Sequence, residues 1–476
     1  MLSAIMAEDK RANGCAQCAE LAAQVAAQQA EIGALKAELA KSQKHSGNSS
    51  KPPSSDITKP RRKPGKRGRP KKRRIGGQPG HERHTRTPFS SDALDHEWLW
   101  YYPACPCCGG QLQDTEETGR TIQQVELPTL PIQIEQHTAQ GQWCAKCDKT
   151  FLPTLPDELR KAGLVGPRLT ALVGFLKGAC HMSYSTLRKY FRDVIGVTIS
   201  RGMLRKLVDK VSASLADPYD ALVAMLPTED RLNVDETGHK ENGRRLWTWC
   251  FRAYLYTVYK ISPSRGSGVL IETLGKEFNG ILGCDYFSAY HKYMKDFGVV
   301  LQFCLAHLIR DVKFLVEHPN PKNQVYGRLL LGDLRRLFGV IHRRDTYASP
   351  SHFQRALEAA RQQLVWDATR RAPWSREAHN LAQRFRENAD SYFRFITEPR
   401  VEPTNNLAEQ AIRFVAIHRR ITQGTRSEDG RRWCERIWTV VQTCAQQGRS
   451  VFEFLCAAVT AYFRSEDAPS LRLDSS

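Results

Sequence analysis

Hydrophobic and polar positions follow a helical pattern near the start of the chain. Between residues 15 and 40, apolar side chains recur three and four positions apart, which places them on one helix face. That face comprises Cys18, Leu21, Val25, Gln28, Ile32, Leu35 and Leu39. Because roughly three heptads are enough for a short coiled coil, residues 1–44 are predicted to self-associate as a homo-oligomer. A single amphipathic helix packed on its own chain is the alternative, since Gly33 and many alanines weaken a coiled coil.

Beyond residue 226, short runs of β-branched, aromatic and other apolar residues predict strands. The runs lie within residues 232–239, 246–251, 254–259, 280–286 and 299–304, and the strands of the first and fourth are each predicted to end at an aspartate, Asp235 and Asp285. A helix is expected at 268–274, and another follows the last run. Three antiparallel strands, a helix and two further strands, each followed by a helix, are the order of a ribonuclease-H-like α/β core. In that order the first strand is central and the strand carrying the next aspartate lies beside it.

The remaining segments have mostly helical periodicity. Residues 156–225 contain a short helix, a break at Gly196 and a helix capped by Ser200, which suits a helix-turn-helix and equally an ordinary helical bundle. In a helix-turn-helix the residues exposed toward DNA would be Arg201, Arg205 and Lys206. The catalytic core is predicted at residues 226–315 and 401–430, with an all-α insertion at 316–400 and a C-terminal helical segment at 431–476.

Positive charge is concentrated before the core. The formal net charge is +20, and residues 41–75 hold fourteen Lys or Arg against one acid, Asp56. Such a composition cannot bury a core, so residues 45–90 are predicted to be a disordered arm that binds nucleic acid. Within it, Arg67, Gly68, Arg69, Pro70 and Lys71 suit a hook in the DNA minor groove. A basic tail that meets phosphates without specificity is an equal alternative.

Targeting signals are absent from the sequence as given. No apolar run approaches the length of a membrane span, and the start MLSAIMAEDK lacks a signal-peptide core. We therefore expect no membrane partner and a cytoplasmic, nucleoid-associated protein. In that compartment fourteen cysteines indicate metal ligands and small core residues rather than disulfides.

Two cysteine pairs predict a structural zinc site within residues 91–155. Each Cys-x-x-Cys turn brings two thiolates to one tetrahedral ion, and two turns close the site. The predicted ligands are Cys105, Cys108, Cys144 and Cys147. Alternating apolar residues between the pairs predict the short strands of a zinc ribbon, which stabilises a small module and does no chemistry. Unpaired thiols without a metal are the alternative.

Three acidic residues stand where catalytic carboxylates are expected. Asp235 and Asp285 each end a short apolar run, and Glu409 lies in the early turns of a helix capped by Thr404, Asn405 or Asn406. Taken singly, strand-end aspartates are often turn residues, and an early glutamate often only compensates the helix dipole.

Three other charged or titratable residues have further predicted roles. Glu236 neighbours Asp235 on a strand and therefore faces the other side, which makes it a poor ligand candidate. His307 and Arg310 could touch a scissile phosphate, and core or ion-pair roles fit them equally well.

Several motifs together resemble the bacterial insertion sequence 66 family of transposases. They are the heptad start, Asn48-Ser49-Ser50-Lys51-Pro52-Pro53-Ser54-Ser55-Asp56, Gly76-Gly77-Gln78-Pro79-Gly80-His81, the two cysteine pairs, Asp235-Glu236-Thr237-Gly238 with Trp247-x-Trp249, Asp285-Tyr286-x-x-Ala289-Tyr290, Cys304-x-x-His307-x-x-Arg310 and Asn405-Asn406-Leu407-Ala408-Glu409. The resemblance covers most of the chain.

This resemblance implies a DDE-type transposase whose acidic triad is Asp235, Asp285 and Glu409. The chemistry agrees, because carboxylates are hard oxygen ligands and two Mg²⁺ or Mn²⁺ ions assist phosphodiester attack. Asp235 would bridge both ions, Asp285 would bind one and Glu409 the other. The implied partners are double-stranded transposon ends, target DNA and small accessory proteins of the same element.

Two alternatives remain open at this stage. A domesticated or inactive relative would bind DNA as a repressor without cutting it. A ribonuclease-H-like nuclease would cut DNA without strand transfer, using the same carboxylates.

Overall fold

The computed structural model describes residues 16–42, 44, 47–48, 89–93, 104–111, 132–140, 142–144, 146, 148–151, 153–398 and 400–472. The chain forms two compact units, one of residues 1–61 and 137–476 and one of residues 62–136. The predicted minor-groove hook at 67–71 lies outside the described residues. Within the described part of the chain, no helix combines the length and apolar character needed to cross a lipid bilayer.

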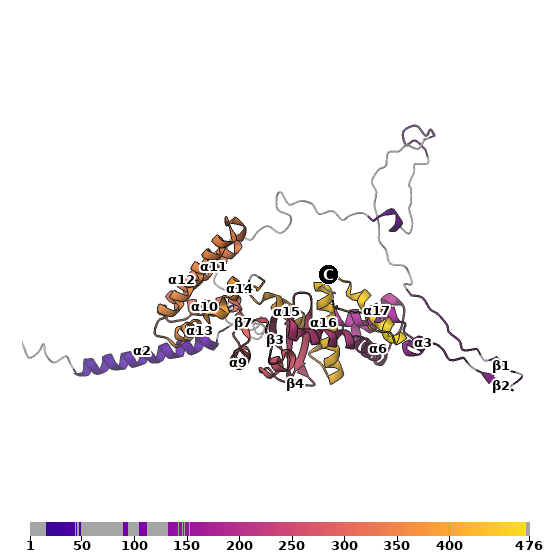
Figure 1. Cartoon of the computed structure of the whole chain (residues 1–476), viewed down its shortest axis with the longest axis horizontal. Helices are drawn as coiled ribbons and strands as arrows, with labels where there is room; N and C mark the ends of the chain where they lie inside the picture. The colour runs from indigo at the N-terminus through magenta and orange to yellow at the C-terminus, as the bar shows by residue number, and fades with distance from the viewer. Residues whose placement is uncertain are drawn as a thin grey trace, which may run out of the picture. The chain divides into compact units, whose positions relative to one another are not determined.

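A five-stranded mixed sheet forms the centre of the larger unit (Figure 1). Its strands are β3 (Arg231–Glu241), β4 (Arg244–Arg252), β5 (Thr257–Ser262), β6 (Ile281–Cys284) and β7 (Val300–Phe303). They lie in the order β5-β4-β3-β6-β7. The pairs β3–β4 and β4–β5 are antiparallel, whereas β3–β6 and β6–β7 are parallel. The expected α/β architecture is confirmed, with the first strand of this sheet at its centre and β6 beside it.

The first strand is longer than the sequence pattern predicts, and Asp235 lies within it rather than at its end. Pairing with β4 continues from Asn233 to Glu241, because Asn242 and Gly243 close a tight hairpin with φ of 47° and 82°. Positive φ at both turn positions matches the twist of paired strands, and Asn-Gly adopts it readily. Similarly, β5 begins three residues after the start of the run expected at 254–259.

Helix α16 (Glu428–Gln446) covers the edge strand β5. Oxygen atoms of its side chains accept hydrogen bonds from alternate backbone N–H groups of the strand. The pairs are Glu435 with Ile261 at 2.6 Å, Thr439 with Tyr259 at 3.0 Å and Thr443 with Thr257 at 3.2 Å. Four residues along a helix span about 6 Å and two along a strand about 6.8 Å, so the two rows stay in register. This edge is therefore closed to pairing with another strand.

Four more helices accompany the sheet. They are α8 (Gly268–Leu274), α9 (Ser288–Phe297), α10 (Leu305–Val316) and α15 (Asn406–Thr422). The helix expected at 268–274 is confirmed as α8. Helix α15 packs on β3 and β4, while α9 contacts β7. Large aromatic side chains fill the core, with Trp249, Tyr290 and Trp438 fully buried.

Residues between α10 and α15 form further helices. These are α11 (Pro321–His342), η5 (Arg344–Thr346), α12 (Pro350–Arg370), α13 (Arg376–Tyr392) and α14 (Arg394–Thr397). Proline at the first helical turn and a capping Asn320 or Ser349 begin α11 and α12, as expected where an N–H group has no helical partner. Packing of α10, α11, α12 and α13 against one another gives these helices a core of their own.

Helices also precede and follow the sheet. They are α3 (Asp157–Ala162), α4 (Pro167–Gly178), α5 (Tyr184–Tyr190), η3 (Phe191–Ile195), α6 (Arg201–Ser214), α7 (Ala216–Met225), η4 (Leu226–Thr228) and α17 (Val451–Arg464). Ser200 caps α6 as expected, because its hydroxyl accepts from the Met203 N–H at 3.1 Å. Gly196 adopts a φ of +80° and ends the preceding turn. Helix α17 packs against α4 and α6, so the end of the described chain completes this helical region.

The first described helix is α2 (Ala16–Ser42), and the other short elements are η2 (Ser91–Ala93) and the antiparallel pair β1 (Gln142–Cys144) and β2 (Lys149–Phe151). The apolar seam of α2 is exposed along its length, with Leu21 56% and Leu39 57% accessible. At its far end Lys41 forms an ion pair with Glu377 of α13 at 3.3 Å. Among the described residues, the seam from Leu21 to Leu39 is thus left without apolar cover.

Candidate active site

Asp235 and Asp285 stand at the same edge of the parallel strands. The last parallel pair of β3 and β6 is Asn233 with Gly283, so each aspartate lies two residues beyond it. Gly283 permits this close packing, because a Cβ atom there would lie 2.5 Å from Nδ2 of Asn233. Neighbouring parallel strands therefore direct the two aspartates to one place, as the sequence order predicts.

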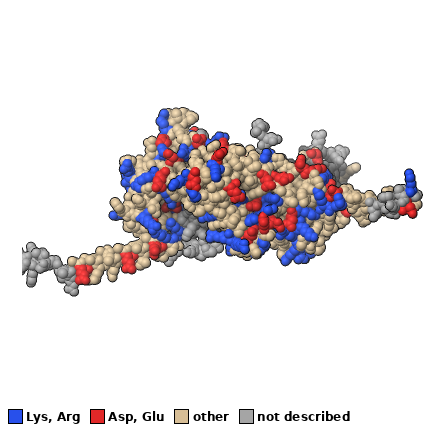
Figure 2. Space-filling view, turned by 60° about the horizontal axis from the view of Figure 1, so that its bottom comes forward, with Lys and Arg blue, Asp and Glu red and all other residues tan. Residues whose placement is uncertain are grey.

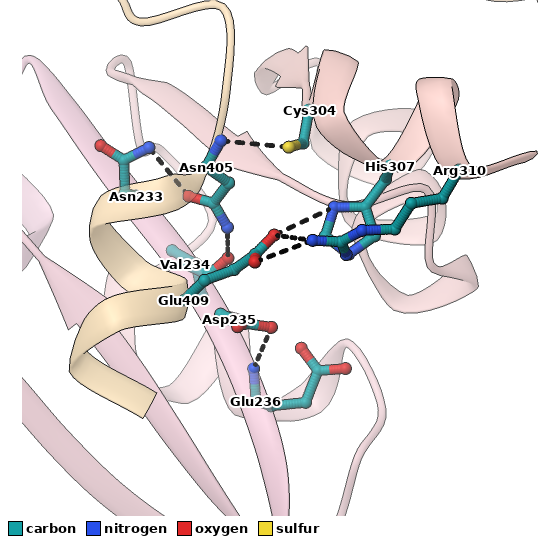
Figure 3. A network of polar contacts seen from close by, with 9 residues as sticks. All are labelled: Asn233, Val234, Asp235, Glu236, Cys304, His307, Arg310, Asn405 and Glu409. Atoms are coloured by element: carbon teal, nitrogen blue, oxygen red, sulfur yellow. Dashed lines mark hydrogen bonds and ion pairs between the residues drawn. The ribbon is translucent and has the colours of Figure 1, made fainter. Parts of the chain in front are cut away.

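Asn405 joins the start of α15 to the central strand (Figure 3). Its Nδ2 donates to the carbonyl oxygen of Val234 at 2.8 Å, and its Oδ1 accepts from Nδ2 of Asn233 at 2.8 Å. Asn405 occupies the N-cap position, yet its side chain makes no capping hydrogen bond. The expected capping role is therefore wrong for Asn405, because its amide satisfies buried groups of β3 instead. One turn later Glu409 is carried toward Asp235.

A second junction fixes the start of α10 beside α15. The backbone N–H of Asn405 donates to Sγ of Cys304 at 3.1 Å, and the Leu305 N–H donates to the carbonyl of Pro403 at 2.9 Å. Cys304 is the N-cap residue of α10. Two helix starts far apart in sequence are thereby held side by side, next to Asn233 and Val234 of β3 and the carboxyl end of β7.

Glu409 is bound by two cationic or potentially cationic side chains of α10. Nη2 of Arg310 lies 3.1 Å from Oε2 and 3.4 Å from Oε1, while Nδ1 of His307 lies 3.5 Å from Oε1. Nη1 of Arg310 also donates to Nε2 of His307 at 3.1 Å. Figure 3 shows the three side chains pointing toward one another, with Asp235 close by. Arg310 thus forms an ion pair, which is one of the roles considered for it.

Glu236 faces the opposite side of β3 from Asn233 and is almost fully buried. Its Oε1 accepts from Nε and Nη2 of Arg265 at 2.9 and 2.7 Å, and its Oε2 accepts from the Tyr290 hydroxyl at 2.6 Å. The Arg265 guanidinium lies over the rings of Trp247 and Phe287, at 4.6 and 3.8 Å from their centroids. Both Glu236 oxygens thus have protein partners. Sequence reasoning missed Arg265, because a Ser-Arg-Gly loop gives no sign of a distant carboxylate.

Burial and mutual repulsion raise the pKa of both aspartates. Burial contributes most to the raised pKa of Asp235, followed by the negative charges of Glu236, Asp285 and Glu409. Burial and the nearby Glu236 raise the pKa of Asp285 to about 7, against a lowering by Arg265. Oδ1 of Asp285 is buried and accepts no hydrogen bond. An orphaned oxygen and unbalanced negative charge fit a site for hard divalent cations.

The three carboxylates do not converge on a single point. Among the described residues, the group of three potential ligand atoms that lie within 4.8 Å of one another is Cys304, His307 and Glu409. The negative charges of both Asp285 and Glu409 act on Asp235.

Two of the residues predicted to contact DNA have protein partners on or near α6. Arg201 donates to Oγ of Ser185 at 2.7 Å, while Nε of Arg205 pairs with Asp209 at 2.7 Å. Arg201, Arg205 and Lys206 share the first two turns of α6, and Arg201 is exposed.

The predicted zinc ligands are only partly described. Cys147 and the Cys144 side chain lie outside the described residues. The Cys105 turn is closed by a hydrogen bond from the Gly109 N–H to the Cys105 carbonyl at 2.8 Å, with Gly109 at a φ of +72°. Hydrogen bonds from the backbone of Cys107 and Cys108 lower the pKa of the Cys105 thiol. That turn therefore favours a thiolate, as a metal knuckle requires.

Comparisons with known proteins identify the family of this chain. A family described as "Transposase IS66 family" matches residues 162–432, and a "Family of unknown function (DUF6444)" matches residues 6–87. In Sinorhizobium fredii (strain NBRC 101917 / NGR234), the uncharacterized protein y4qI is 25% identical over 339 residues, covering 64% of this chain and 61% of the relative. The uncharacterized protein y4hP of the same strain is 23% identical over 400 residues, covering 76% of this chain and 71% of the relative.

This chain therefore spans less than two thirds of the length of y4qI. The family match, by contrast, covers more than half of this chain and includes β3, β6 and α15 with all three carboxylates. The chain belongs to the IS66 family of transposases.

Proposed function

We propose that this protein is a DDE-type transposase, which binds the ends of its insertion sequence and catalyses metal-dependent DNA cleavage and strand transfer. The observation that carries the proposal is that Asp235 and Asp285 each lie two residues beyond the last parallel pair of β3 and β6, with Glu409 of α15 near enough to Asp235 to raise its pKa. The strand order β5-β4-β3-β6-β7 supports a ribonuclease-H-like core. The helices between α10 and α15 are the proposed insertion into that core.

Asp235, Asp285 and Glu409 would hold two Mg²⁺ or Mn²⁺ ions. When bound, such ions polarise the scissile phosphate and lower the pKa of the attacking water or 3′-hydroxyl. The protein supplies the positions of the carboxylates, because Asn405 ties α15 to β3 and Arg265 neutralises Glu236. Arg310, when released from Glu409, is long enough to bind a phosphate oxygen of the DNA.

DNA recognition is assigned to segments before the core. The basic segment 41–75 carries most of the excess positive charge of the chain. On the face shown in Figure 2, Lys and Arg are interspersed with Asp and Glu over the body of the protein. The arm with Arg67, Gly68, Arg69, Pro70 and Lys71 is therefore the main proposed electrostatic contact. Helix α6, with Arg201, Arg205 and Lys206 on its first turns, is the proposed second contact.

Two further modules complete the proposal. Cys105, Cys108, Cys144 and Cys147 would bind a structural zinc ion, which is supported by the thiolate-stabilising turn at Cys105. The exposed seam of α2 supports a homo-oligomer formed through this helix. Small accessory proteins of the same element are a further proposed class of partner.

The test is incubation of the purified full chain with Mg²⁺ and a labelled transposon-end DNA. Wild type should nick the end and produce a joined product with target DNA. Asp235→Ala should reduce both rates by more than about 10³-fold while DNA binding is retained. Asp230→Ala is the matched control, since Asp230 is exposed and paired with Arg400 just before β3.

Each other outcome supports a different protein class. Binding without cleavage by wild type would support a repressor. Cleavage without joined product would support a nuclease that lacks strand transfer. Nicking retained by Asp235→Ala would overturn the assignment of the carboxylates.

A further inference from the structure

Cys304, His307 and Glu409 form a cluster of mixed ligand types beside the proposed catalytic carboxylates. Sγ of Cys304, a ring nitrogen of His307 and a carboxylate oxygen of Glu409 all lie within 4.8 Å of one another. Zinc-class ions bind this mixture of sulfur, nitrogen and oxygen, whereas Mg²⁺ requires oxygen ligands. The cluster therefore differs in chemical preference from the aspartate pair.

The ring nitrogen that faces the cluster has no hydrogen-bond partner. Nδ1 of His307 is buried and unsatisfied, and it lies 3.5 Å from Oε1 of Glu409. Two ligand atoms of a tetrahedral zinc ion at bond lengths near 2 Å are separated by about 3.3 Å. This nitrogen and oxygen are thus already spaced as two ligands of one ion would be.

The thiol of Cys304 belongs to the same cluster and lies at a helix start. Its Sγ accepts the backbone N–H of Asn405 at 3.1 Å, and it stands at the N-terminus of the twelve-residue helix α10. Burial raises the pKa of the Cys304 thiol, and the backbone N–H groups of Asn405 and His307 only partly oppose that rise, so binding of an ion would release the thiol proton. Because His307 is three residues later on the same helix, both side chains point to one side. Two ligands from α10 and one from α15 would make the ion a bridge between the helix starts.

In this structure the guanidinium of Arg310 supplies the positive charge next to Glu409 and His307. It donates to both oxygens of Glu409 and to Nε2 of His307. Because Nε2 accepts this bond, the ring proton resides on Nδ1 while Arg310 is in place. An ion at Nδ1 would move the proton to Nε2 and release Arg310, whose side chain is 22% accessible and can turn toward solvent. The guanidinium and the ion are therefore mutually exclusive partners of Glu409.

We propose that Cys304, His307 and Glu409 form a binding site for a zinc-class divalent ion, which displaces Arg310 and competes with the proposed catalytic ions for Glu409. The site itself is independent of the proposed function. One consequence rests on the proposed function. Zinc bound at this site removes Glu409 from the ligands of Mg²⁺ or Mn²⁺, so zinc inhibits DNA cleavage.

Cobalt(II) is a suitable probe, because it replaces zinc and produces an intense near-ultraviolet absorption when bound to a thiolate. The full chain, purified with zinc and dialysed to remove loosely held ions, is titrated with Co²⁺ alone. Wild type should gain a cobalt–thiolate band that is absent from Cys304→Ser. Other cysteines that take up cobalt contribute equally to both proteins, so the difference spectrum isolates Cys304. Cys444→Ser is the matched control, since Cys444 is also a buried thiol and lies on α16.

Two further variants keep the result interpretable. Glu409→Gln retains the thiol and should weaken cobalt binding by about 10-fold or more. Asp235→Ala should leave the cobalt–thiolate band unchanged, because Asp235 is not a member of the cluster. Far-ultraviolet circular dichroism of each variant verifies the fold.

An identical cobalt–thiolate band in wild type and folded Cys304→Ser would overturn the proposal, as would unchanged cobalt affinity in Glu409→Gln. These outcomes concern binding alone, so they are distinct from failure of the DNA cleavage assay. A protein that binds cobalt at Cys304 but never cleaves DNA would support this site and refute the proposed function.

Discussion

Asn405→Ala provides a direct test of how the third carboxylate is positioned. The side chain of Asn405 is 1% accessible and forms two 2.8 Å hydrogen bonds to β3, one to the carbonyl of Val234 and one from the amide of Asn233. Alanine removes both bonds and leaves two polar groups without their partners. Glu409, one turn further along α15, then loses the contact that fixes the start of its helix.

The magnitude follows from what each group can do afterwards. A typical hydrogen bond contributes about 1 kcal/mol net, and a buried group left unsatisfied costs about 1–3 kcal/mol. Asn233 is only half-buried, so its amide can bind water and contributes at the lower end. We therefore expect Asn405→Ala to lower the free energy of unfolding by about 2–4 kcal/mol. Asn405→Asp should cost more, because a carboxylate oxygen would then face the Val234 carbonyl.

Urea denaturation followed by circular dichroism measures the effect, with Asn406→Ala as the matched control. Asn406 is the next residue of the same type, is exposed and begins α15. Its replacement should change stability by less than about 0.5 kcal/mol. Equal effects of the two substitutions would refute the role assigned to Asn405.

Two further predictions concern buried carboxylates and use the same denaturation assay. Arg265→Ala leaves the buried Glu236 carboxylate without its cation and should destabilise the protein by about 3 kcal/mol, whereas adding Glu236→Gln should restore part of the loss; an unchanged loss in the double variant would contradict the ion-pair argument. On α11, burial and then the negative charge of the facing Asp367 raise the pKa of Asp333 to about 6. The stability that this carboxyl contributes is therefore present below its unfolded pKa and is lost as pH rises through about 6. Asp333→Asn should therefore raise the free energy of unfolding by about 1–3 kcal/mol at about pH 8 and change it little at about pH 4, and a gain of equal size at both pH values would contradict this reasoning.

The sheet order could be predicted because each strand carries its own local signal. Apolar runs before Asp235 and Asp285 predict two strands, and the helix and strands that follow leave few ways to connect them. Parallel pairing of β3 and β6 then brings the two aspartates together without further information. This part of the site needs only the order of elements along the chain.

The sequence contains a signal for the full length of β3, but the first apolar run alone predicts a shorter strand. Asn242-Gly243 is a strong hairpin signal, and its recognition would have extended the strand past Asp235 to Glu241. By contrast, no local pattern distinguishes Asn405 from Asn406. Which of them is buried depends on the packing of α15 against β3, and that packing is set by residues far away in the chain.

The partners of the carboxylates also depend on contacts between residues that are far apart in the sequence. Arg265 meets Glu236 across 29 residues, and Arg310 meets Glu409 across 99 residues. Charged residues are common, so their sequence positions do not reveal which carboxylate each will bind. Only the three-dimensional fold separates the paired carboxylates from the unpaired ones.

The carboxylates of the site therefore differ in whether an arginine is bonded to them. Four carboxylates surround this part of β3, but the only arginines bonded to them in the described structure are Arg265 on Glu236 and Arg310 on Glu409. Asp235 and Asp285 retain unbalanced charge, which is why repulsion adds to burial in raising the pKa of both. At neutral pH this charge favours either a proton or a cation at the aspartates. Arg310 is already bonded to Glu409, so a metal ion would bind Glu409 only by displacing Arg310. In the proposed site, the aspartate pair would therefore provide most of the affinity for divalent ions, and Glu409 would become a ligand only after Arg310 leaves it.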